Sequence, residues 1–177
     1  MKIFVTSIFL ALAALSNVEF AHAGEKRYFN LKEIKITSRN PNVFDLGKLK
    51  TTVHENSPQN TFSIENFKVV NAISDDQDFE LTYEIRSGDS LVMKAADKLS
   101  TSIEKNPLIQ GLKECSNMPE ALPIEENGYD FNSCEIDENL LDGQKVGEMR
   151  VNMQVLKKPT KEILMDMEVK GVISEQD

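Results

Sequence analysis

The chain has 177 residues, a formal net charge of -9 at pH 7 and two cysteines, Cys115 and Cys134. This acidic balance argues against a nucleic-acid partner, because phosphates require a basic binding surface. It also argues against lasting adhesion to anionic membranes.

Residues 1–23 have the features of a secretory signal peptide. Lys2 is followed by an apolar stretch, Ile3–Leu15, and by the small-residue end Ala21–Ala23. The alternative, a membrane anchor, is disfavoured because spanning a bilayer takes about 20 apolar residues. We therefore expect a secreted, extracellular domain over residues 24–177, without stable membrane insertion. In an oxidising compartment its two cysteines are expected to form a disulfide, with two free thiols as the alternative.

The first half of this domain carries apolar residues at alternate positions, which predicts strands. The alternation in Tyr28–Thr37 slips by one residue, which indicates a β-bulge. Val43–His54 is predicted to be an edge strand. A third strand, with a second slip, carries Phe62, Ile64, Phe67 and Val69.

A hairpin and a short helix follow. Phe79–Ile85 and Leu91–Ala95 are predicted to pair across the turn Arg86–Ser90. Asn106 and Pro107 are suited to the start of a helix whose Leu108, Ile109 and Leu112 share one face. The next predicted strand, Tyr129–Asp137, contains Cys134, so the disulfide would join the helix end to a sheet.

The last third predicts two long strands around a turn at Lys157–Lys161. Met149, Val151, Met153 and Val155 alternate with polar residues in the first strand. Ile163, Met165, Met167 and Val169 occupy alternate positions in the second, opposite Leu164, Asp166, Glu168 and Lys170. This period of two predicts that the strand pair has one buried face and one solvent-exposed face. With the turn spacing upstream, it favours a β-sandwich or barrel.

Residues suited to catalysis or metal binding are few. His54 is the one histidine of residues 24–177 and lies in a polar stretch, so we expect a surface residue and no enzyme. Asp137, Glu138 and Asp142 invite a calcium interpretation, but their spacing differs from the EF-hand and an acidic turn explains them better. We expect neither a metal nor a cofactor.

Methionine on strands is the less usual feature, because its flexible thioether adapts to variable apolar partners. The candidate ligand pocket combines methionines with other apolar strand residues: Phe62, Phe67, Phe79, Leu81, Ile85, Met93, Met149, Met153, Met165 and Met167. An ordinary core padded with methionine is the alternative.

Several positions in the C-terminal half are typical of one family. They are Cys115, the pair Gly128-Tyr129 before a strand, Ile136, the segment Gly147–Arg150 and the closing segment Met167–Val172. On these the chain resembles the lipid-recognition family that includes the ganglioside activator and secreted arthropod relatives, among them chemosensory proteins of insect gustatory hairs. The resemblance implies a mainly β, single-domain, immunoglobulin-like antiparallel β-sandwich, here with one short helix, that holds lipid between its sheets without catalysis.

We therefore expect a secreted carrier or binding protein for a lipid or other small apolar ligand. The alternative is a secreted interaction protein, such as a component of venom, saliva, seminal fluid or haemolymph. It would act on a receptor or other protein through its surface and have no ligand cavity.

Overall fold

The computed structural model describes residues 26–56, 59–74, 78–136, 141 and 144–175. Two helices, α2 (Leu99–Lys105) and α3 (Pro107–Glu114), accompany nine strands: β1 (Arg27–Ser38), β2 (Phe44–Asp45), β3 (Lys50–His54), β4 (Thr61–Val69), β5 (Phe79–Ser87), β6 (Ser90–Lys98), β7 (Asn127–Cys134), β8 (Gly147–Lys157) and β9 (Glu162–Glu175). The predicted signal peptide, residues 1–23, lies outside the described residues. Within the described part, no helix combines the length and apolar character needed to cross a membrane.

The strands form two antiparallel sheets, as predicted for a β-sandwich. The larger sheet has the order β1-β9-β8-β5-β6. In the smaller sheet β4 is central: β7 pairs along one side, and β3 and β2 pair with successive parts of β4 on the other. The sheet faces pack together because each carries apolar side chains at alternate positions.

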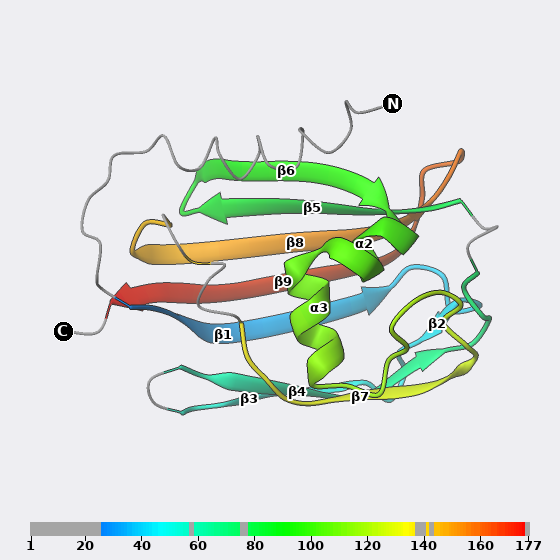
Figure 1. Cartoon of the computed structure of the whole chain (residues 1–177), viewed down its shortest axis with the longest axis horizontal. Coiled ribbons are helices and arrows are strands. Elements are labelled where there is room, and N and C mark those ends of the chain that lie inside the picture. Colours follow the sequence, from blue (N-terminus) through cyan, green and yellow to red (C-terminus); the bar gives the residue numbers. More distant parts are fainter. Residues whose placement is uncertain (1–25, 57–58, 75–77, 137–140, 142–143, 176–177) are drawn as a thin grey trace.

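The two long sides of the sandwich are closed in different ways. On one side, backbone oxygens of β1 accept hydrogen bonds from Asn60 Nδ2 (3.0 Å, to Leu31 O) and Thr51 Oγ1 (3.3 Å, to Ile34 O), which join β1 to the small sheet. On the other side, α2 and α3 run from the end of β6 to β7 and fill the space between the sheets (Figure 1). Together α2 and α3 form what we call the helical wall, which extends from the β6 edge of the larger sheet to β7 of the smaller sheet.

Most of the predicted strand patterns are confirmed. Met149, Val151, Met153 and Val155 of β8 are all buried, and the predicted bulge in β1 lies between Leu31 and Glu33. The slip in β4 is also present, with Asn66 at φ 61° inside the second of two register shifts, between Ile64 and Phe67. The β5–β6 hairpin turns within two residues, Gly88 and Asp89, and Gly88 adopts φ 56°, which glycine reaches without strain.

Two predictions were wrong in detail. Val43–His54 is two strands, β2 and β3, because the segment at Gly47 turns. Leu164, predicted on the wet face of β9, is buried, because the register shifts between Val155 and Leu156 opposite it. The predicted short helix is α3, and in the described part of the chain a second helix, α2, precedes it.

Gly171 of β9 lies where the backbone and an aromatic ring come close together. A Cβ atom at this position would lie 2.5 Å from Phe29 Cζ and 2.7 Å from the carbonyl oxygen of Asn30. Because the backbone oxygen cannot move aside freely, Gly171→Ala should destabilise the fold by about 1–3 kcal/mol, measured by urea unfolding. Gly128→Ala in β7 is the control, since its Cβ would meet nothing within 4 Å. Equal stability of the two variants would show that the Phe29 contact is absent.

Glu80 of β5 is nearly buried and bound by two lysines of the β8–β9 turn. Its carboxylate lies 2.5 Å from Lys158 Nζ and 2.8 Å from Lys161 Nζ. The hydrogen bond from Lys158, followed by that from Lys161, lowers the pKa of Glu80 below its ordinary value of 4.5.

A carboxyl whose pKa is lower in the folded state stabilises the fold above its unfolded pKa and loses that contribution as pH falls. Glu80→Gln should therefore lower the thermal midpoint at pH 7, and its difference from wild type should shrink below pH 4.5. Scanning calorimetry across this range, with the exposed Glu114→Gln as control, measures the effect. A difference that does not depend on pH would contradict the pairing.

Candidate functional site

An apolar cavity of about 100 Å³ lies between the two sheets and the helical wall. Its surface is apolar throughout, because strands of both sheets and both helices point hydrocarbon or thioether side chains into it. The lining residues are Ile36, Phe44, Ile64, Phe67, Val69, Ile73, Leu81, Leu99, Ile103, Ile109, Leu112, Met118, Ile124, Phe131, Met153, Val155, Met165 and Met167.

A second, smaller apolar cavity of about 40 Å³ continues the same inter-sheet space. It is lined by Phe29, Ile34, Phe62, Ile64, Leu112, Ile136, Met149, Val151, Met153, Met167 and Val169. Four of these residues, Ile64, Leu112, Met153 and Met167, also line the larger cavity. The two cavities therefore adjoin through these four side chains.

The structure brings most of the predicted pocket residues together. The larger cavity includes Phe67, Leu81 and Met165, the smaller one includes Phe62 and Met149, and Met153 and Met167 line both.

Three predicted residues lie elsewhere. Phe79 lines a separate hollow beside Asn71. Ile85 and Met93 are half-buried on β5 and β6 and are absent from the lining of both inter-sheet cavities as the described residues bound them. Met93 belongs to the edge strand of its sheet, where strand alternation continues beyond the enclosed space.

The helical lining was missing from the sequence-based pocket. Leu99 and Ile103 of α2 stand four residues apart, which puts both on one helix face toward the cavity. Ile109 and Leu112 of α3, predicted to share one helix face, also line the cavity, although the sequence-based pocket did not include them. The side chain of Leu108 lies outside what the structure describes. The i, i+4 spacing of Leu99 and Ile103 was the available signal for α2.

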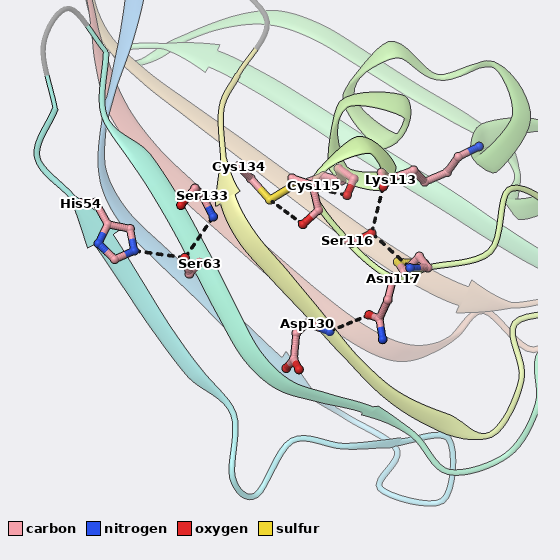
Figure 2. Close-up of a disulfide and its surroundings, with 11 residues drawn as sticks. His54, Ser63, Lys113, Cys115, Ser116, Asn117, Asp130, Ser133 and Cys134 are labelled. Carbon is pink, nitrogen blue, oxygen red and sulfur yellow. Dashed lines mark hydrogen bonds between the residues drawn. A yellow bond between two sulfur atoms is a disulfide. The ribbon is translucent and has the colours of Figure 1, made fainter.

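The predicted disulfide is present and anchors the wall. Cys115 directly follows α3 and is bonded to Cys134 at the end of β7, with Cα atoms 5.3 Å apart (Figure 2). The carbonyl oxygen of Cys115 also accepts a hydrogen bond from Asn132 N at 2.8 Å. The C-terminal end of α3 is therefore fixed to the smaller sheet by both a covalent bond and a backbone hydrogen bond.

Lys113 of α3 fastens the two helices to the loop that follows them, although its side chain is only 4% exposed. Its Nζ donates to Ile103 O at 3.2 Å and to Glu120 O at 2.9 Å, and lies 2.9 Å from Glu120 Oε2. Three acceptors match the three donors of an ammonium group, which permits its burial. The ammonium group of Lys113 therefore lies outside the cavity lining, and its bonds hold α2, α3 and the following loop together.

Among the described residues, the groups with acid, base or metal chemistry lie apart from the cavities. His54 is exposed, as predicted, with Nε2 3.0 Å from Ser63 Oγ (Figure 2). Burial, followed by the charge of Asp97, raises the pKa of Tyr83 above 10.0, so this half-buried phenol is neutral at physiological pH. Among the described residues no group of three His, Cys, Asp or Glu is placed to hold a metal ion. The acidic turn residues Asp137, Glu138 and Asp142 lie outside the described residues.

No protein-family model matches this chain, and no curated protein shows significant similarity.

Proposed function

We propose that this chain is a secreted, non-enzymatic carrier or binding protein that holds a lipid or other small apolar ligand between its two sheets. The observation that carries the proposal is the inter-sheet cavity, whose surface is apolar throughout. Burial of hydrocarbon against such a surface lowers the free energy. The surface offers no group for acid–base or nucleophilic chemistry. The resemblance of the C-terminal half to the lipid-recognition family supports the same function.

Ligand entry requires the helical wall to move. The larger cavity, about 100 Å³, is smaller than the roughly 300 Å³ at which small-molecule pockets begin. The wall is the boundary better able to move, because α2 and α3 pair with neither sheet and the covalent attachment is at the C-terminal end of α3 alone. In addition, the hydroxyl of Ser102 in α2 is buried without a hydrogen-bond partner among the described residues, which is unfavourable in the closed state.

The proposal is tested by titrating the purified protein with an apolar naphthylamine dye that fluoresces only outside water. We expect saturable fluorescence that straight-chain fatty acids abolish by competition. Ile109→Phe, which adds volume to the cavity lining on α3, should weaken dye binding about tenfold or more, since the ring takes up part of the space in which the dye would bury its apolar area. Leu91→Phe, at a residue 53% exposed on β6, is the control and should bind like wild type. A wild-type protein that binds no dye would refute the carrier function.

A second candidate, a secreted interaction protein, is favoured by a different surface. The outer face of the large sheet has a polar hollow of about 400 Å³, with charged residues from four of its five strands, among them Lys35, Glu84, Lys94, Asp166 and Glu168. A venom, saliva, seminal-fluid or haemolymph protein acting on a receptor would use such a surface. Charge reversal of Lys35 and Lys94 would then abolish the biological effect while leaving dye binding unchanged; the carrier function predicts no such loss.

A further inference from the structure

The two inter-sheet cavities lie end to end along the strands. On β8, Met149 and Val151 line the smaller cavity, Met153 lines both, and Val155 lines the larger one. On β9 the same order holds in reverse, with Met165 in the larger cavity and Met167 in both. At a rise of about 3.3 Å per residue, Met149 to Val155 covers about 20 Å. Together the cavities follow one long path through the sandwich.

The boundary between the cavities contains two directly paired methionines. Met153 and Met167 are cross-strand partners in the β8–β9 register, and Ile64 of β4 and Leu112 of α3 complete the boundary. Ile64 is β-branched, only 1% exposed and stiff at χ1. A methionine side chain is unbranched and rotates about three bonds, so it can change its shape at little cost. The methionine pair is therefore the part of the boundary suited to open.

Resting on the proposed carrier function, we propose that Met153 and Met167 form a constriction that joins the two cavities into one channel when their thioethers swing aside. The channel then admits a single unbranched chain that runs past the pair, and the pair sets the length of chain that binds. Chains short enough for the larger cavity do not depend on the constriction. Longer chains gain affinity only by passing it.

The test is a series of straight-chain fatty acids, from hexanoic to hexadecanoic acid, that compete with the naphthylamine dye. Each methylene that enters the channel should improve wild-type affinity about fourfold until the channel is full. The double variant Met153→Ile/Met167→Ile keeps a similar side-chain volume but stiffens both residues. Its affinity for hexadecanoic acid should fall at least about tenfold more than its affinity for hexanoic acid, since the methylenes beyond the constriction stay in water.

Met165→Ile is the matched control, because this methionine is on the same strand and lines the larger cavity without reaching the boundary. It should keep the wild-type dependence on chain length. Leu112→Ala is a second test variant, and it replaces the double variant if the double variant does not fold. It widens the constriction and should raise the affinity for hexadecanoic acid more than that for hexanoic acid.

The outcomes separate the two proposals. A folded double variant with the wild-type dependence on chain length overturns the constriction and leaves the carrier function intact. A Leu112→Ala variant whose affinity depends on chain length as in wild type also overturns the constriction and leaves the carrier function intact. A wild-type protein that binds none of the acids overturns the carrier function, and the constriction with it.

Discussion

Met153→Asp is expected to prevent folding, or at least retention of any apolar ligand. The side chain is 9% exposed and lies at the boundary of both cavities, so a carboxylate there would be buried without a partner. An uncompensated buried charge costs about 3–5 kcal/mol, a large part of the stability of a typical domain. Circular dichroism and urea unfolding measure the loss.

Asn152→Asp is the matched control, one residue away on the opposite face of β8. Its cross-strand partners are Glu84 and Glu168, so the new carboxylate meets like charges at a cost of about 1 kcal/mol or less. The variant should fold and bind apolar dye like wild type. Equal tolerance of the two substitutions would show that the assignment of inner and outer faces is wrong.

Removal of the disulfide is expected to have the second large effect. Replacing Cys115 and Cys134 by alanine frees a loop with a sequence separation of 19 residues. The loss should be about 3 kcal/mol, because the unfolded chain regains the entropy of the open loop. Urea unfolding measures the change, and alanine avoids placing a hydroxyl at Cys134, which is fully buried.

The same double variant should loosen the helical wall before it loosens the sheets. The wall is fixed to β7 at Cys115, whereas the pairing of β8 with β9 does not involve the disulfide. Hydrogen exchange should therefore speed up in α3 and in residues 116–126 while β8 amides stay protected. Unchanged exchange in α3 would show that Lys113 and the packing of the helix suffice to hold the wall.

The strands and the disulfide could be predicted because their signals are local. The alternation of Met149 to Val155 depends only on neighbouring residues, and so does the slip in β1 at Leu31. Leu164 could not be placed correctly, because it is the extra residue of β9 where the register against β8 shifts, and the alternation within β9 alone does not reveal that shift. The helix α2 begins at Leu99 without a side-chain cap, so the usual start signal is missing.

The candidate site was predicted in part, for a similar reason. Alternation identifies which strand residues point inward, and Met153 and Met167 were among them. Alternation does not show how far the enclosed space extends across the sheet, so the same pattern also selects Met93 on the edge strand β6. Nor does it show that Ile103 closes the space from a helix, because that contact joins elements brought together only by the fold.

The measurement that tests the central claim most directly is native mass spectrometry of the protein secreted from eukaryotic cells, with identification of anything released on denaturation. The carrier function predicts a co-purifying lipid or other apolar compound at near-stoichiometric amount, or its uptake when fatty acids or phospholipids are added. A ligand-free mass that stays unchanged after both additions would contradict it and favour a protein that acts through its surface.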